Sequence, residues 1–391
     1  MRNKSFWGLL LISSLLLCLF SIGYAQPQGK YIIVFDQPTA DTLKSDVIQK
    51  FGGTFVKPLK LINGAAVILP DETAKKALSR QAGIKRIDDD IEFHITGKKP
   101  PQPPAAQVTP WGIGTVNAPA AWSISKGAGV KVAILDTGIS LTHPDLAANV
   151  KGGINTIRAT KSANDDNGHG SHCAGIVAAV NNTVGVVGVA PAASLYAVKV
   201  LNSAGIGSLS DIIEGLQWCI DNQIQVASMS FGSDASNTSE HEAIIKAYNA
   251  GITLVAAAGN DGAANSVDYP GAYPEVIAVS ALNSNLSLAS YSSYGPEVDI
   301  AAPGTQIYST YKGTAYATLS GTSMATPHVT GVVALRLAQN SSQSPAEIKT
   351  AIQTTAIDLG LSADKQGAGL INADAVVDYP VFFFASAELL D

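Results

Sequence analysis

Short apolar segments alternate with helical stretches along most of the chain after residue 106. Alternation at this spacing implies a parallel β-sheet covered by helices on both faces, because parallel strands need long crossover connections. The segments expected as strands are 130–135, 194–200, 226–229, 253–257 and 276–280, and those expected as helices are 168–179, 208–221, 240–250 and 322–339. We therefore expect an α/β fold with a central, mostly parallel sheet.

Residues 30–95 have the pattern of a separate, small α+β unit. Strands are expected at 30–35, 54–56, 65–69 and 84–95, and helices at 38–50 and 71–80, with Asp71 as a helix cap. The order β-α-β-β-α-β corresponds to a ferredoxin-like plan. A unit of about 65 residues is marginally stable alone, so we expect it to need a partner surface. The following KKPPQPP segment is a Pro-rich linker that should be extended and open to cleavage.

The first 25 residues have the pattern of an export signal. Arg2 and Lys4 give a basic start, residues 9–20 are apolar except for two serines, and GYA at 23–25 has small residues at a cleavage position. The alternative is a transmembrane anchor, but the apolar run is short for a bilayer span of about 20 residues. We expect a secreted protein with no membrane segment after signal removal.

Charge divides the chain into two parts of opposite sign. The whole chain has a formal net charge of −6, and its 14% charged and 46% hydrophobic residues exclude intrinsic disorder. Residues 1–105 carry 14 basic and 9 acidic side chains, a balance of +5, whereas the remainder carries 11 and 22, a balance of −11. The acidic remainder argues against nucleic acid as a partner, because phosphate binding needs a basic surface. The opposite signs favour contact between the two parts.

Four polar residues occupy strand ends and helix starts, where an α/β fold gathers reactive groups. Asp136 ends an expected strand, and Asn260 follows another. His169 and Ser323 each open an expected helix among glycines. A serine nucleophile needs an imidazole to take its proton, and the imidazole needs a carboxylate to fix its tautomer. A side-chain amide and the backbone N–H groups at a helix start can stabilise an oxyanion.

Each of these signals has a plainer interpretation when it stands alone. An Asp at a strand end is often a helix cap, and a Ser beside Gly is often part of a turn. A metal cluster of Asp165, Asp166, His169 and His172 is disfavoured, because no complete zinc-ligand spacing is present. The histidines at 143, 241 and 328 are expected to be structural or on the surface.

Taken together and in this order, the motifs closely resemble those of the subtilisin-like serine proteases. They are LDTG around Asp136, GHGSHCAG around His169, AAAGN around Asn260 and GTSMATPHVTG around Ser323. The resemblance runs from about residue 108 to residue 377 and implies a three-layer fold in which these four residues are catalytic. It also implies an endopeptidase that cleaves protein and peptide substrates through an acyl-enzyme.

The N-terminal unit resembles the propeptide of this family, a chaperone and tight inhibitor whose C-terminal end occupies the active-site cleft. The resemblance divides the chain into a signal peptide (1–25), a propeptide (26–97), a linker (98–105) and a peptidase domain (106–391). It implies a self-processing zymogen whose basic propeptide faces an acidic enzyme, where charge aids the encounter more than the final affinity. Because the Pro-rich segment is an insertion, the self-cleavage bond stays open between about His94 and Gln107.

Substrate-binding residues are implied by the same resemblance. Residues 230–232 match the strand edge that lines the primary specificity pocket, and residues 205–207 match the opposite strand, which pairs with an extended substrate. The residues assigned in this way are Gly205, Gly207, Ser230, Phe231 and Gly232. Asp261 and Asp268 match positions near the rim and floor of the primary specificity pocket, where they would admit basic side chains as well as large apolar ones.

A structural calcium site is also implied by the resemblance. Its ligand-bearing residues are Gln107, Asp145, Val180, Asn182, Val184 and Val186. Three side chains and three backbone carbonyls suit calcium, which takes six to eight oxygen ligands. The plainer alternative for residues 180–186 is an Asn-Asn turn.

Two cysteines remain after signal removal, Cys173 and Cys219. Both lie in helix-like apolar stretches, and a single pair is no disulfide framework, so we expect buried free thiols and not a bridge. Cys173, one helical turn after His169, resembles the free Cys of the proteinase K and thermitase branch, which implies sensitivity to mercurials.

The sequence therefore predicts a secreted, monomeric serine endopeptidase of broad specificity. Two alternatives stay open, a processing protease of narrow specificity and a catalytically silent binding protein that keeps the fold. The complete set of four motif residues argues against the silent protein, which would have no need for all four.

Overall fold

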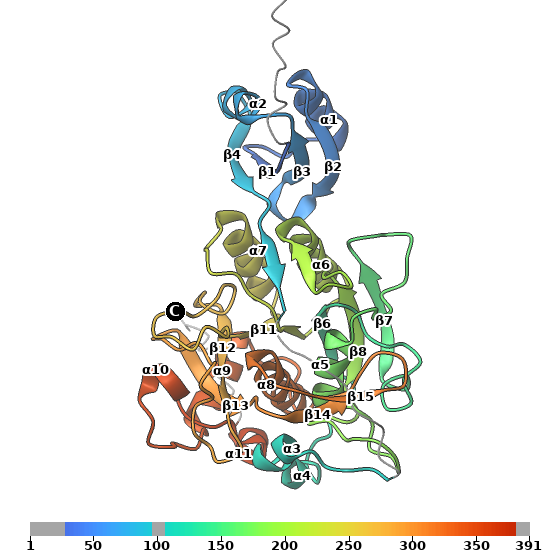
Figure 1. Ribbon diagram of the computed structural model, residues 1–391, viewed down its shortest axis with the longest axis vertical. Coiled ribbons are helices and arrows are strands. Elements are labelled where there is room, and N and C mark those ends of the chain that lie inside the picture. The colour runs from blue at the N-terminus through green and yellow to red at the C-terminus, as the bar shows by residue number, and fades with distance from the viewer. Residues whose placement is uncertain (1–27, 96–105, 381–391) are drawn as a thin grey trace, which may run out of the picture.

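The computed structural model describes residues 28–95 and 106–380, which form two contacting units (Figure 1). The N-terminal unit, residues 28–95, packs on helices of the larger C-terminal unit, residues 106–380. The expectations for the signal peptide and for the linker concern residues outside the described part. Over the described ranges, no helix combines the length and apolar character needed to cross a membrane.

The N-terminal unit has the ferredoxin-like plan that the sequence predicts. Its strands form one antiparallel sheet in the order β2-β3-β1-β4. The elements are β1 (Gly29–Phe35), α1 (Asp41–Lys50), β2 (Thr54–Leu59), η1 (Lys60–Ile62), β3 (Gly64–Leu69), α2 (Glu72–Leu78) and β4 (Ile84–Asp89). Side chains of β1 alternate between two cores, with Ile33 facing the unit's own helices and Ile32 facing the C-terminal unit. Asp71 caps α2 as expected.

The expectation of one continuous strand over 84–95 is wrong. The chain forms β4 and then a separate strand, β5 (Glu92–His94), which pairs with β9 (Ile206–Ser208) of the C-terminal unit. The break lies at Asp90, whose carboxylate accepts hydrogen bonds from the backbone N–H of Ser210 at 2.9 Å and from its hydroxyl at 2.8 Å. These bonds to the other unit draw the chain out of its own sheet.

A seven-stranded sheet forms the centre of the C-terminal unit. Its strand order is β13-β12-β11-β10-β6-β8-β7, and every neighbouring pair is parallel. The strands are β6 (Lys131–Asp136), β7 (Val150–Asn155), β8 (Ser194–Lys199), β10 (Val226–Met229), β11 (Thr253–Ala257), β12 (Val276–Leu282) and β13 (Val298–Pro303). The five central strands agree with the expected segments. The edge strands β7 and β13 were not predicted, because β7 is partly exposed and contains two glycines, and β13 is interrupted by an acidic residue.

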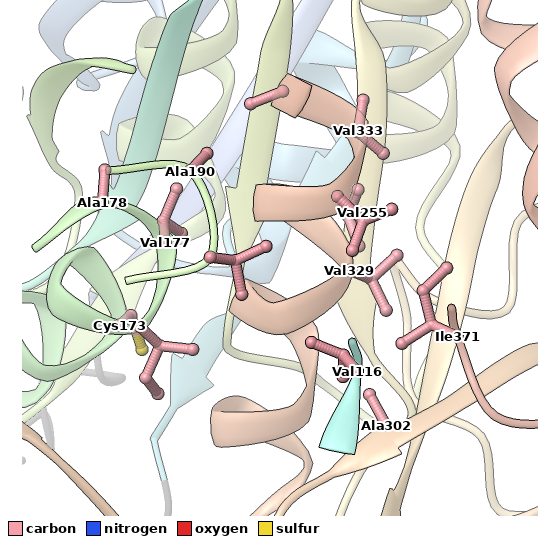
Figure 2. Close-up of a cluster of buried hydrophobic side chains, with 14 of the residues drawn as sticks. Val116, Cys173, Val177, Ala178, Ala190, Val255, Ala302, Val329, Val333 and Ile371 are labelled. Atoms are coloured by element: carbon pink, nitrogen blue, oxygen red, sulfur yellow. The ribbon is translucent and has the colours of Figure 1, made fainter. Parts of the chain in front are cut away.

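Helices cover both faces of this sheet and complete the expected three layers. The helices α5 (His169–Ala178) and α8 (Thr322–Leu337) pack on one face, and α6 (Leu209–Asp221) and α7 (Thr238–Asn249) pack on the other. Within β6, Val132 contributes to the first core and Ala133 to the second. Figure 2 shows part of the first core, where Val329 of α8 lies beside Val255 of β11.

The remaining elements border the sheet. They are α3 (Trp111–Thr115), α4 (Ala118–Ala121), the hairpin of β14 (Ile307–Thr310) and β15 (Tyr316–Leu319), α9 (Pro345–Thr354), α10 (Ala363–Gln366) and α11 (Ala373–Asp378). Most are too short to give a periodic pattern. α9 did have a readable start, because Ser344 and Glu347 form a capping box.

Candidate active site

Asp136 and His169 are brought together at the carboxyl edge of the central sheet. Asp136 is the last residue of β6, and His169 is the first residue of α5. The Nδ1 atom of His169 lies 2.9 Å from both carboxylate oxygens of Asp136, and neither side chain is more than 3% exposed. Burial opposes the charged imidazole, but Asp136 and the nearby Cys173 outweigh burial and raise the pKa of His169 well above its ordinary value. The pair is therefore suited to accept a proton at Nε2.

The close approach of α5 to β6 requires glycine at position 170. A Cβ atom added to Gly170 would lie 2.1 Å from the carbonyl oxygen of Gly138 and 3.0 Å from the Cβ of Asp136. A side chain there would push α5 away from β6 and separate His169 from Asp136. The motif therefore needs glycine after His169, because any side chain at position 170 would clash with Gly138 and Asp136.

Ser323 lies at the start of α8, beside Ser230 at the end of β10. Its hydroxyl donates to the Ser230 carbonyl at 3.0 Å, and the Ser230 hydroxyl donates to the Ser323 carbonyl at 3.0 Å. Cys173 connects this segment to His169, since its Sγ lies 3.4 Å from the Ser323 carbonyl oxygen and 4.0 Å from His169 Nδ1. The buried Nε2 of His169 has no hydrogen-bond partner among the described residues. The expected bond from Ser323 to His169 is therefore not formed in this conformation, in which the Ser323 hydroxyl donates to the Ser230 carbonyl instead.

Asn260 lies next to the candidate nucleophile, in the loop that follows β11. Its Oδ1 accepts hydrogen bonds from the backbone N–H of Thr322 at 2.9 Å and from the Thr322 hydroxyl at 3.3 Å. The Thr322 hydroxyl also accepts the N–H of Gly259 at 3.2 Å. These bonds fix the Asn260 amide against the residue that precedes Ser323, which is where a side-chain donor to an oxyanion is needed.

A strand of the same chain runs across this site between two edges of the C-terminal unit. β5 pairs antiparallel with β9, and the backbone N–H of Ile95 donates to the Gly205 carbonyl at 3.1 Å. On its other side, His94 forms an antiparallel bridge with Gly232. The two edges expected to bind substrate, 205–207 and 230–232, therefore hold an extended peptide in the structure.

One side chain of this strand fills an apolar pocket. Phe93, opposite Gly207, is completely buried, and its ring meets the ring of Phe231 edge-to-face at 5.7 Å and 82°. Phe231, expected to line the cleft, therefore contacts the bound peptide directly. This contact adds apolar side-chain packing to the backbone pairing.

The carboxylate of Asp268 lies between the 230–232 edge and the segment that leads to Asn260. A Cβ atom added to Gly232 would lie 2.8 Å from Oδ2 of Asp268, and one added to Gly259 would lie 2.6 Å from the same oxygen. Burial, followed by the charges of Asp261 and Asp234, raises the pKa of Asp268 to about 7. Asp261 itself is exposed at the rim.

Comparisons with known proteins agree with this geometry. A profile described as the subtilase family matches residues 127–372. The chain belongs to the subtilase family. Subtilisin NAT of Bacillus subtilis subsp. natto is 42% identical over 391 aligned residues, which cover 96% of this chain and 99% of that protein. Subtilisin Savinase of Lederbergia lenta is 49% identical over 271 residues, covering 69% and 99%, and an alkaline protease of Shouchella clausii is 47% identical over 300 residues, covering 76% and 75%. This subtilase is accordingly a serine endopeptidase.

Charge pairs hold the N-terminal unit of the subtilase on α6 and α7. The Nζ of Lys57 lies 2.6 Å from a carboxylate oxygen of Asp211 and 2.6 Å from one of Glu214. Arg86 lies 2.8 Å from Glu242. Burial opposes the charge on Lys57, but the two carboxylates outweigh it and raise its pKa. Basic residues of the small unit thus pair with acidic residues of the large one. This agrees with the contact that the opposite net charges of the two parts predict.

Acidic residues of the small unit bind the first turns of the same helices, a feature that the sequence analysis missed. Asp90 accepts hydrogen bonds from Ser210 at the start of α6, and Asp88 accepts one from the Ser239 hydroxyl at the start of α7. Carboxylates are stabilised at helix N-termini by unpaired N–H groups and by the helix dipole. The three consecutive aspartates at 88–90 were the available signal for these contacts. The net charge of the N-terminal part does not show them, because that charge is positive.

The expected calcium ligands of the subtilase gather around the buried carboxylate of Asp145. Its oxygens accept hydrogen bonds from the side-chain amide of Asn182 at 2.9 Å and from the backbone N–H of Val186 at 2.8 Å. The side-chain amide of Gln107 donates to the Val180 carbonyl at 3.1 Å. Segments far apart in the sequence therefore bring several oxygen atoms to one place.

Both cysteines of the described part are buried free thiols, as the sequence predicts. Cys173 lies in the core on the α5 and α8 side of the sheet, and Cys219 lies in the core on the other side. The ligand atoms of Asp136, His169 and Cys173 lie within 4.8 Å of one another, so a soft metal ion could bridge them. Burial raises the pKa of the Cys173 thiol and opposes its own ionisation. Sensitivity to mercurials stays a prediction.

The other histidines are accounted for by local structure. His143 and His328 are buried and hydrogen-bonded to backbone atoms, and burial lowers the pKa of His328 to about 4. His172 is also buried against two backbone carbonyls, and its pKa is lowered to about 3. His241 is partly exposed and pairs with Glu275 at 3.0 Å.

Proposed function

We propose that Ser323, His169 and Asp136 form the catalytic triad of this endopeptidase. The observation that carries the proposal is the His169–Asp136 pair next to Ser323, with a peptide strand lying across the site. Ser323 acts as the nucleophile and His169 as general base and then general acid, while Asp136 keeps the imidazole protonated at Nδ1. The backbone N–H of Ser323 and the side-chain amide of Asn260 donate to the oxyanion.

Each half of the reaction passes one proton through His169. The Oγ of Ser323 bonds to the substrate carbonyl carbon while its proton moves to Nε2 of His169, giving a tetrahedral oxyanion. The C–N bond then breaks, and the amine leaves with that proton, so that an acyl-enzyme remains. Water attacks the acyl carbon, gives a proton to His169, and releases the acid as Ser323 is restored. Asp136 stabilises the imidazolium in both halves, in keeping with the raised pKa of His169.

We further propose that the chain is a secreted zymogen, with a signal peptide at 1–25, a propeptide at 26–97, a linker at 98–105 and a peptidase at 106–391. The position of β5 supports an inhibitory role, because an edge that pairs with β5 is closed to other peptides. The pairing of His94 on both sides supports self-cleavage downstream of this residue. Release of the propeptide then leaves a monomeric, acidic enzyme open to protein and peptide substrates.

Broad specificity follows from how the peptide is held. Backbone pairing to the edges that contain Gly205, Gly207 and Gly232 is independent of side-chain identity. Selectivity comes from the specificity pocket that the resemblance assigns to the residues beside Ser230 and Gly232, where Asp268 lies against Gly232 and Asp261 is exposed. An ionised Asp268 would pair with a basic side chain of the residue just before the cleaved bond, and a protonated Asp268 would tolerate a large apolar one.

Calcium fits the donor set around Asp145. One carboxylate, the amide oxygens of Gln107 and Asn182, and the carbonyls of 180, 184 and 186 give six oxygen-bearing groups. Gly185 has a φ of 65°, and a Cβ atom added there would lie 2.0 Å from Oδ2 of Asp145, so the loop wraps closely around the carboxylate. The Asn182 amide oxygen accepts the N–H of Val184 at 2.8 Å, and turning the Gln107 and Asn182 amides would direct both oxygens to an ion. A bound calcium would neutralise Asp145 and tie residue 107 to the 180–186 loop.

Replacing the candidate nucleophile tests the proposed chemistry. We expect the parent chain to yield a processed enzyme and Ser323→Ala to remain an unprocessed precursor, because self-cleavage requires the Ser323 hydroxyl. Intact-mass measurement of both chains reports the result, and the parent's new N-terminus identifies the bond. Ser320→Ala, which removes a hydroxyl three residues earlier that accepts the N–H of Gln306, serves as the matched control. Processing of Ser323→Ala at the same bond would refute the assignment.

The pKa of Asp268 predicts a pH-dependent substrate preference. Asp268 becomes ionised as the pH rises through about 7, so the ratio of kcat/KM for a Lys peptide to that for the matching Phe peptide should rise roughly tenfold between pH 6 and pH 8. Because the titration of His169 affects kcat/KM for both peptides equally, it cancels in this ratio. Asp268→Asn should give a low ratio at every pH, and a rise equal to that of the parent would contradict the role of Asp268.

Removing calcium should destabilise the parent chain. In the inactive Ser323→Ala background, where self-digestion is absent, we expect a chelator to lower the thermal midpoint by several degrees, because the carboxylate of Asp145 loses its counter-charge. Asp145→Asn should start from a lower midpoint and respond little to the chelator. In that background, a thermal midpoint that is the same with chelator and with added calcium would exclude the site.

A further inference from the structure

Asp165 carries a buried carboxylate that the proposed reaction does not use. It lies in the loop before α5 and is 3% exposed. One oxygen accepts hydrogen bonds from the Thr137 hydroxyl at 2.9 Å and from the backbone N–H groups of Asn167 at 2.9 Å and Gly168 at 2.8 Å. The other accepts the backbone N–H of Ser171 at 2.9 Å and the hydroxyl of Ser171 at 2.6 Å. Five donors therefore converge on one side chain.

These bonds join the two segments that carry His169 and Asp136. The backbone N–H of Thr137 donates to Oδ1 of Asp136 at 2.7 Å, and the Thr137 hydroxyl accepts the N–H of Gly170 at 3.0 Å. Asp165 therefore binds Thr137, the residue after Asp136. It also binds Gly168 and Ser171, which lie before and after His169 at the start of α5. We propose that Asp165 is a positioning residue that fixes the His169–Asp136 pair in its reactive geometry; this inference rests on the proposed triad.

A carboxylate is the only common side chain that satisfies this arrangement. Both oxygens receive backbone N–H donors, so the NH₂ group of an Asn at this position would face a donor in either orientation. Other charged and titratable groups also surround the His169–Asp136 pair and Asp165. These groups are His172 and Cys173 on α5, Lys199 on β8, and Tyr311 after β14, while Asp166 approaches from the surface through its ion pair with Lys199.

Asp166 offers a matched control for the loss of charge. It is the next residue, its side chain is 54% exposed, and it pairs with Lys199 at 2.8 Å without binding the start of α5 through its carboxylate. Asp166→Asn therefore removes the same charge one position away and leaves the bonds of Asp165 intact. A difference between the two variants measures positioning and not net charge.

The test uses the full chain and follows self-processing by intact mass from pH 5 to pH 9. The bound strand makes this reaction intramolecular, so the rate reports chemistry without substrate binding. We expect Asp165→Asn to process about 100-fold more slowly than the parent at pH 7. The acid limb of its pH–rate profile should also move to lower pH, because a less firmly positioned Asp136 stabilises the His169 imidazolium less. Asp166→Asn should stay within about twofold of the parent, and equal rates for the two variants would overturn the proposal.

A second measurement does not depend on activity. In the Ser323→Ala chain, proton NMR reports the low-field resonance of the proton between His169 Nδ1 and Asp136. Asp165→Asn should shift or broaden this resonance, and Asp166→Asn should leave it in place; an unchanged resonance in Asp165→Asn would also overturn the proposal. If the parent fails to process, the triad assignment falls, while this resonance still tests Asp165.

A pair of variants at Thr137 covers the case in which Asp165→Asn does not fold. Thr137→Val removes the hydroxyl that links Asp165 to the segment of Asp136 and keeps the shape, whereas Thr137→Ser keeps the hydroxyl. We expect slow processing with a shifted acid limb in the first variant and recovery in the second. Equal rates and equal pH profiles for the two would refute the positioning role.

Discussion

The geometry of the proposed triad depends on the parallel pairing of β6, β10 and β11, whose carboxyl ends meet at one edge of the sheet. Asp136 ends β6, Ser230 follows β10, and Asn260 lies in the loop after β11, and the three strands pair in continuous register. The helices α5 and α8 contact each other on one face and begin at this edge. Residues from four distant parts of the chain therefore meet without a dedicated binding loop, as is typical of open parallel sheets.

The small unit packs on the helices α6 and α7 and brings β5 to this edge of the sheet. The small unit is marginal in size and packs its apolar residues, including Ile32 and Leu59, into the core formed by α6 and α7. Lys57 and Arg86 meet carboxylates, while Asp88 and Asp90 meet helix starts, so each sign of charge finds its complement. This docking places β5 between the 205–207 and 230–232 edges, and the proposed inhibitory role of the small unit rests on that placement.

The sequence predicted those features that have local causes, and it missed those set by tertiary contacts. Apolar runs revealed the five central strands, and motif order revealed Asp136, His169, Asn260 and Ser323 as a group. Periodicity could not reveal the break at Asp90, because its cause is a hydrogen bond to the other unit. The orientation of the Ser323 hydroxyl toward Ser230, and the convergence of donors on Asp165, likewise depend on distances that no sequence pattern contains.

The most direct test of the triad is covalent labelling with a fluorophosphonate probe, which reacts with activated serine hydroxyls. Peptide mapping by mass spectrometry should find one labelled serine in the processed enzyme, Ser323. The His169→Ala variant is isolated as the folded precursor, and an added protease then removes its N-terminal unit. Labelling of this variant should be at least 100-fold lower than that of the parent enzyme. Label on another serine, or undiminished labelling of Ser323 without His169, would contradict the account.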